Sequence, residues 1–113
     1  MAGPDEHLTQ LRKGSLQLAV LALLASEPRY GFDIVEALAA HPGLDVNAGT
    51  IYPLLTRLKH AGLVETTWQE SPLGPPRKYY RLSAAGTAEL AAQRAAWDQL
   101  AATMTALLAG TAR

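Results

Sequence analysis

The chain has 113 residues, ten cationic and ten acidic, and 49% of its residues are hydrophobic, which suits one globular domain with a modest core rather than a disordered chain. The absence of cysteine excludes disulfides, thiol catalysis and thiolate zinc sites. No apolar run has membrane-spanning length and the first residues lack the features of a signal peptide, so we expect a cytoplasmic protein without a membrane partner.

The charges are distributed unevenly. Residues 1–49 carry three cations against six acids, whereas residues 50–82 carry five cations against two acids. The zero net charge argues mildly against a nucleic-acid partner, but a local basic zone sets the electrostatic footprint of a surface. The second segment therefore remains a candidate for binding an anionic partner.

The first half of the chain is predicted to be helical. Residues 4–13 are polar and can begin a helix, and residues 15–25 are almost entirely apolar. A helix apolar on most of its circumference must be covered on several sides, and in so small a domain we expect one side to be another subunit. Residues 30–40 predict the next helix, which ends at His41-Pro42-Gly43. Its inward residues are expected to be Tyr30, Ile34, Val35 and Leu38.

Residues 47–62 predict an amphipathic helix. Apolar residues recur at i, i+3, i+4 and i+7: Ile51, Leu54, Leu55 and Leu58. Asn47 is a good N-cap, and Gly62 can adopt the left-handed conformation that ends a helix. The outer face has hydroxyls, cations, one aromatic and no carboxylate: Gly49, Tyr52, Pro53, Thr56, Lys59 and His60, flanked by Thr50 and Arg57. Such a face suits a DNA major groove, although an ordinary solvated surface is the alternative.

A β-hairpin is expected next. Residues 63–70 alternate as a strand, residues 71–76 form a proline-rich loop, and residues 77–82 form the second strand. We expect Trp68 to pack rather than to recognise a ligand. Arg77 and Lys78 follow the tip and would neutralise phosphates, but neighbours on a strand face opposite ways, so one can point inward. Arg12 and Lys13 are further candidates for a phosphate contact.

The final segment predicts one long helix. Ser83 can cap it, and the alanine-rich chain is helical to about residue 108. Large residues recur at sevens in two companion series: Leu90, Trp97 and Met104, then Gln93, Leu100 and Leu107. This heptad-like stripe favours pairing with a second copy of the chain.

Three stretches make the chain resemble the PadR family of bacterial transcriptional regulators. They are Arg29-Tyr30-Gly31-Phe32-Asp33-Ile34; Gly49-Thr50-Ile51-Tyr52-Pro53-Leu54-Leu55-Thr56-Arg57-Leu58 with Ala61-Gly62-Leu63-Val64; and Pro76-Arg77-Lys78-Tyr79-Tyr80-Arg81-Leu82-Ser83-Ala84-Ala85-Gly86. Pro53, which removes a backbone bond inside the helix, belongs to this pattern. The single C-terminal helix resembles the small subfamily that dimerises through it.

The resemblance implies a mainly α fold with a small β-hairpin: a winged helix-turn-helix domain over residues 1–82 and a dimerisation helix over residues 83–113. It implies a homodimeric repressor on a palindromic operator, with a flat aromatic or phenolic effector as a further expectation. The expected DNA contacts are Asn47, Gly49, Thr50, Tyr52, Thr56, Arg57, Lys59, His60, Arg77 and Lys78. The expected dimer interface is Leu90, Trp97, Leu100, Met104 and Leu107. The expected effector site is Trp97, Leu90, Ala101 and Leu16, with a closed dimer interface around Trp97 as the alternative.

Two other classes of function compete with this hypothesis. A winged-helix module that binds protein instead of DNA would suit the neutral net charge, but the basic helix face and cationic hairpin oppose it. An enzyme is disfavoured because the sequence has no clustered carboxylates, no glycine-rich phosphate loop and no histidines at ligand spacing. No metal or cofactor is expected.

Overall fold

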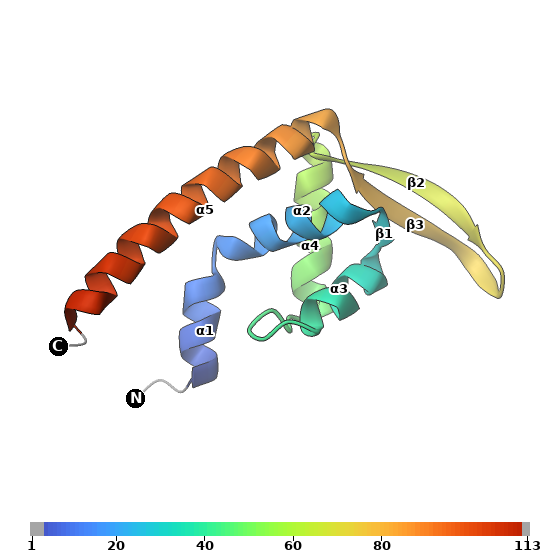
Figure 1. Cartoon of the computed structure of the whole chain (residues 1–113). Coiled ribbons are helices and arrows are strands. Elements are labelled where there is room, and N and C mark those ends of the chain that lie inside the picture. The colour runs from blue at the N-terminus through green and yellow to red at the C-terminus, as the bar shows by residue number, and fades with distance from the viewer. Residues whose placement is uncertain (1–3, 112–113) are drawn as a thin grey trace.

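The computed structural model describes residues 4–111, and Figure 1 shows a helical body with a projecting β-ribbon and one long helical arm. In chain order the elements are α1 (Pro4–Arg12), α2 (Ser15–Ser26), β1 (Arg29–Tyr30), α3 (Gly31–Ala39), α4 (Ala48–His60), β2 (Val64–Ser71), β3 (Gly74–Leu82) and α5 (Ala84–Thr111). The fold is mainly helical with a small sheet, as predicted. No helix in this part of the chain is long and apolar enough to cross a membrane. Residues 1–3 and 112–113, at the ends of the two predicted domains, lie outside the described residues.

The core lies where α2, α3 and α4 meet the inner end of the sheet. Its buried hydrophobic side chains are Val20, Leu21, Leu24, Ile34, Leu38, Val46, Ile51, Leu54, Leu55, Leu58, Val64 and Tyr80. All four apolar residues predicted for the inner face of α4 are among them. The period of the sequence therefore placed the buried face of this helix correctly.

Both ends of α4 are fixed by the predicted capping residues. The side-chain Oδ1 of Asn47 accepts a hydrogen bond from the backbone N–H of Thr50 at 3.1 Å. At the other end Gly62 has a φ of 76°, and the N–H groups of Gly62 and Leu63 donate to the carbonyls of Lys59 and Leu58, each at 3.0 Å. This is a Schellman motif, which satisfies carbonyls that the helix end would otherwise leave unpaired. α4 continues through Pro53 without interruption.

The sheet has three strands in the order β1-β3-β2, so the prediction of a simple hairpin was incomplete. Tyr30 does not begin a helix as predicted: Arg29 and Tyr30 pair antiparallel with Tyr80 and Tyr79 of β3. A two-residue strand is too short to show an alternating pattern, and it forms because β3 offers it free hydrogen-bonding groups.

The predicted loop over residues 71–76 was also too long. β2 reaches Ser71, β3 begins at Gly74, and these two residues are paired across the turn. Pro75 and Pro76 therefore lie within β3. They are tolerated because β1 pairs with β3 only at residues 79 and 80, which leaves one edge of β3 unpaired at residues 75 and 76.

The start of α5 is locked to the end of α4. Ser83 accepts a hydrogen bond from the N–H of Gly86 at 3.0 Å, and its own N–H donates to the carbonyl of Leu63 at 3.1 Å. Gly86 is buried, and a Cβ there would overlap the Leu63 carbonyl oxygen. Glycine stands at the position where a capping box prefers glutamate because no side chain fits.

We predict that Gly86→Ala lowers the free energy of unfolding by about 2 kcal/mol, because the backbone of Leu63 must move to admit a methyl group. Chemical denaturation followed by circular dichroism would measure this. Gly110→Ala in the same helix is the matched control, since a Cβ there meets nothing within 4 Å. Equal stabilities of the two variants would contradict the proposed close contact.

Candidate nucleic-acid interface

The outer face of α4 is exposed along its whole length and carries no acid. Every residue predicted for this face is exposed: Gly49, Thr50, Tyr52, Pro53, Thr56, Arg57, Lys59 and His60. The helical period separates three rows on it. Tyr52 and Lys59 lie on one flank and Thr50 and Arg57 on the other, with Thr56 and His60 between them. A groove that received α4 would meet polar and cationic groups in all three rows.

Three of these polar side chains also make bonds inside the chain. Oδ1 of Asn47 is occupied by the helix cap, and the Thr50 hydroxyl lies 3.4 Å from it. The Thr56 hydroxyl donates to the backbone carbonyl of Tyr52 at 3.1 Å. The amide nitrogen of Asn47 and the hydroxyl oxygens of the threonines remain able to meet a partner.

Tyr52 packs against its own chain more closely than predicted. Its ring covers Gly31 at the start of α3, where a Cβ would overlap the ring. It also lies near Tyr80 of β3, whose pKa is raised by burial and, secondarily, by the charge of Tyr52. Tyr52 therefore helps to fix α4 against α3 and the sheet while 41% of the residue stays exposed.

We call the hairpin of β2 and β3 the wing. Its two cations, Arg77 and Lys78, each lie against a tyrosine ring. The guanidinium carbon of Arg77 lies 4.4 Å from the ring centroid of Tyr30, and the Nζ of Lys78 lies 5.6 Å from that of Tyr80. Tyr79 packs edge-on against Tyr30 at 5.6 Å. Arg77 and Lys78 oppose Gln69 and Trp68 and so point to opposite faces, as predicted, with Lys78 the more buried.

Only part of this arrangement was predicted from sequence patterns. Tyr30 was predicted to be a core residue and instead supports a wing cation, because the long-range pairing of β1 with β3 brings it there. Trp68 was predicted to pack but is 69% exposed within this chain. The closely spaced cations and tyrosines at residues 77–80 were the available signal that an aromatic ring would support a wing cation. Nothing in the sequence indicated that Trp68 would be exposed.

Ion pairing leaves an excess of positive charge around α4. Arg29 pairs with Glu27 at 3.4 Å and with Asp33 at 3.3 Å, and Arg81 pairs with Glu65 at 2.8 Å. Within residues 4–111 no such pair is formed by six cations on and beside α4: Arg12, Lys13, Arg57, Lys59, Arg77 and Lys78. Unpaired cations on both sides of an exposed helix suit the two phosphate backbones that border a DNA groove.

The family of the chain follows from its sequence. Residues 20–92 match the Transcriptional regulator PadR-like family, which covers more than half of the chain. The chain belongs to this family of transcriptional regulators. PadR-like proteins regulate transcription by binding DNA and are not enzymes.

Individual relatives agree with this assignment. The PadR-like chain is 32% identical to the transcriptional regulator Rv3488 of Mycobacterium tuberculosis over 94 residues, which is 83% of this chain and 86% of that protein. A PadR-like regulator from Bacillus cereus is 35% identical, with a TM-score of 0.81 over 88% of this chain and 96% of that one. A PadR family regulator from Eggerthella lenta is 38% identical, with a TM-score of 0.81 over 91% and 89%. The winged-helix fold and the C-terminal helix are thereby confirmed.

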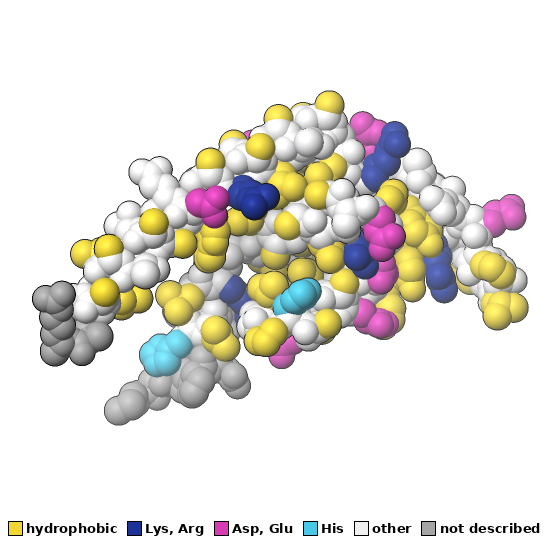
Figure 2. Space-filling model, in the orientation of Figure 1, with side chains coloured by type: hydrophobic (Ala, Val, Ile, Leu, Met, Phe, Trp, Pro, Cys, Tyr) yellow, Lys and Arg dark blue, Asp and Glu magenta, His cyan; other side chains and the backbone are white. Residues whose placement is uncertain are grey.

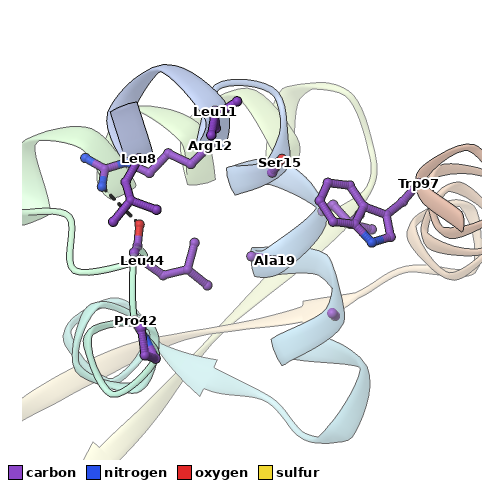
Figure 3. A pocket seen from close by; sticks show the side chains of 11 residues that line it. Leu8, Leu11, Arg12, Ser15, Ala19, Pro42, Leu44 and Trp97 are labelled. Carbon is purple, nitrogen blue, oxygen red and sulfur yellow. Dashed lines mark hydrogen bonds between the residues drawn. The ribbon is translucent and has the colours of Figure 1, made fainter. Parts of the chain in front are cut away.

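The residues predicted for an effector site do not all come together. Trp97 lines an open, mainly apolar cavity of about 410 Å³ between α5, α2, α1 and the loop after α3. Figure 3 shows it facing Ser15 and Ala19, with Leu8 and Leu44 farther along the cavity. Leu16 lines a different cavity on the other side of α2, and Leu90 packs against the chain's own core. Ala101 is half-buried and does not line the Trp97 cavity.

The predicted interface residues beyond Leu90 are exposed. Trp97, Leu100, Met104 and Leu107 are 48%, 57%, 42% and 62% exposed. Figure 2 shows hydrophobic side chains gathered where α5 passes over α2 and α1. Across residues 4–111, no cluster of three histidine, aspartate or glutamate side chains could hold a metal ion.

We predict that Arg77→Ala/Lys78→Ala weakens DNA binding on every sequence and lowers the slope of log affinity against log salt by about 0.9 for every phosphate that is no longer neutralised. Fluorescence anisotropy over a salt series would measure it. Arg81→Ala is the matched control on the same strand, because Arg81 is already paired with Glu65. An unchanged slope in the double variant would show that these cations do not bind phosphates.

Proposed function

We propose that this PadR-like regulator is a cytoplasmic repressor that binds a palindromic operator as a homodimer. Residues 1–82 would bind the DNA and residues 83–113 would pair two copies. The exposed apolar stripe on α5 is the observation that carries this proposal. The DNA contacts would come from α4 in the major groove and from Arg77 and Lys78 on the wing.

The dimer is supported by the length and surface of α5. The helix has 28 residues and so extends roughly 42 Å, and its first turns already pack Leu90 against the core. Beyond them the stripe exposes one large apolar residue at every third or fourth position. Full burial of an apolar side chain of this size contributes about 1.5–3 kcal/mol of free energy, so the pairing of two stripes would be strongly favourable. A two-fold axis through α5 would present the two α4 helices to successive major grooves, roughly 34–36 Å apart or a multiple of that.

We predict that the protein sediments as a dimer and that Leu100→Glu/Met104→Glu converts it to a monomer, because four carboxylates would meet in the apolar interface. Ala95→Glu/Ala102→Glu is the matched control, since these exposed residues lie on the opposite side of the helix. Analytical ultracentrifugation would separate the outcomes. A Leu100→Glu/Met104→Glu variant that remains dimeric would exclude this stripe as the interface.

Repression and operator choice need DNA from the protein's own genomic neighbourhood. A gel shift on the fragment upstream of its coding sequence, followed by a reporter assay with that fragment, would test both. A retarded complex and lower reporter output are expected. A dimer that ignores every such fragment in dilute buffer would favour the alternative of a winged-helix module that binds protein.

We also propose that a flat aromatic effector binds against Trp97 and releases the DNA. The Trp97 cavity supports this, because its lining is apolar apart from a few groups such as Arg12 and Ser15. The cavity lies between α5 and the helices that carry α4, so a ligand there can favour one spacing of the two recognition helices over another. Leu16 and Leu90, which were predicted for the effector site, do not line this cavity and are not part of the proposed site.

We predict that planar aromatic cations and phenols quench Trp97 fluorescence in a Trp68→Phe background, which leaves Trp97 as the only tryptophan. The same compounds should weaken the gel-shift complex of this variant, and Trp97→Ala should make the complex insensitive to them. If no member of a broad panel quenches the fluorescence, the Trp97 region is a closed interface and not an effector site.

A further inference from the structure

A second cavity lies beside α4, on the flank away from the wing. It has a volume of about 410 Å³ and is formed by the joint between α1 and α2, the residue before the α4 cap, and the first turns of α4. Its polar lining residues are Thr9, Arg12, Lys13, Gln17, Thr50 and Arg57. We call it the α4-flank cavity.

Three cations line this cavity and no acid does. Arg12 is held in place by a hydrogen bond from Nη1 to the carbonyl oxygen of Gly43 at 3.0 Å, while Lys13 and Arg57 are exposed. None of the three forms an ion pair within the described residues. Asp45 is the acid that borders Arg12, but it lines a separate neighbouring hollow. The α4-flank cavity is therefore a concentrated positive site.

The cavity lies on one flank of α4, and the wing cations lie on the other. Thr50 and Arg57 are seven residues apart and lie in one row, whereas Tyr52 and Lys59 form the row on the opposite flank. Tyr52 lines a hollow between α4 and the wing together with Arg77 and Lys78. Unpaired cations therefore lie on both sides of the exposed face of α4, in the wing on one side and in the α1–α2 joint on the other.

We propose that the α4-flank cavity binds a phosphate of the DNA backbone, on the strand across the major groove from the strand that the wing contacts. Lys13 and Arg57 would hold the phosphate through charge and through hydrogen bonds from their side-chain N–H groups. Arg12, fixed by Gly43, would add positive charge and keep the α1–α2 joint against the loop. This inference rests on the DNA binding proposed above and adds the α1–α2 joint, through Arg12 and Lys13, to the contacts proposed for α4 and the wing.

The favoured ligand is a DNA phosphate rather than a free organic anion, because the cavity opens beside the face of α4 that enters the groove. A duplex seated on α4 places a charged backbone along each flank of the helix, within reach of long cationic side chains. The wing cations Arg77 and Lys78, which line the hollow beside Tyr52, would provide the corresponding contact on the other flank.

The test uses full-length protein and a DNA fragment that the wild-type dimer binds. The variants are Lys13→Ala/Arg57→Ala and, as the control, Arg94→Ala, an exposed cation on α5 that also lacks an ion pair in the described part of the chain. The salt dependence of binding is measured by anisotropy. Bound phosphates are mapped by ethylation interference. Lys13 and Arg57 are exposed and Thr50 is retained, so the double variant should fold.

The salt slope of the double variant should fall by about 0.9 for each phosphate that it no longer neutralises, and one ethylation-sensitive phosphate per half-site should disappear. Arg94→Ala should change neither. A double variant with the wild-type slope and interference pattern would overturn the inference while leaving DNA binding intact. Failure of the wild type itself to bind DNA would instead overturn the proposed function. A third measurement is the binding of the anionic dye anilinonaphthalene sulfonate. If the double variant loses this binding while its interference pattern stays that of the wild type, the cavity binds a free organic anion instead.

Discussion

The rest of the structure depends on the burial of one face of α4. Ile51 and Leu55 are fully buried, and Leu54 and Leu58 are almost fully so, packed between α2, α3 and the sheet. An apolar face held this tightly leaves the opposite face of the helix rigid and exposed. Asn47 and Gly62 fix the two ends, so the polar side chains between them have defined positions. The proposed matching of α4 to the edges of bases would need this rigidity, because hydrogen bonds lose strength within a few tenths of an ångström.

Hydrogen bonds between the end of α4 and the start of α5 fix the long helix relative to α4. Leu63 follows the Schellman motif of α4, and its carbonyl accepts a hydrogen bond from the N–H of Ser83 while lying against Gly86. The hydroxyl of Ser83 donates to the carbonyl of Gly62. The end of α4, the start of β2 and the start of α5 are thus bonded to one another within a few residues. If two copies pair through α5, this joint converts the geometry of the pairing into the distance between two recognition helices. An effector near Trp97 would act through the same joint.

The parts of the fold that could be predicted from the sequence are those with a strong local pattern. α4 combined a clear helical period with a cap at each end, and Ser83 marked the start of α5. The parts that could not be predicted depend on contacts between distant residues. β1 has two residues and no pattern of its own, and it forms only because β3 lies beside it. That pairing moves Tyr30 out of the predicted helix and under Arg77. Leu90 fits the heptad stripe by spacing, yet it packs into the core because α5 starts there.

The zero net charge argued against nucleic acid, and the structure explains why the total is misleading. Glu27, Asp33 and Glu65 pair with Arg29 and Arg81, and α4 itself carries no acid. Among the described side chains, cations near α4 are therefore left without carboxylate partners, although the whole chain is neutral. Fields from exposed charges are screened beyond about 8 Å at physiological salt, so a duplex seated on α4 responds to these nearby cations more than to distant acids. Weak long-range attraction also means that affinity must come from close fit. In the proposed dimer this fit would combine phosphates that meet cations on each flank of α4 with two α4 helices that match two half-sites at once. A neutral protein of this design would bind random DNA poorly and would owe its selectivity to the spacing set by α5.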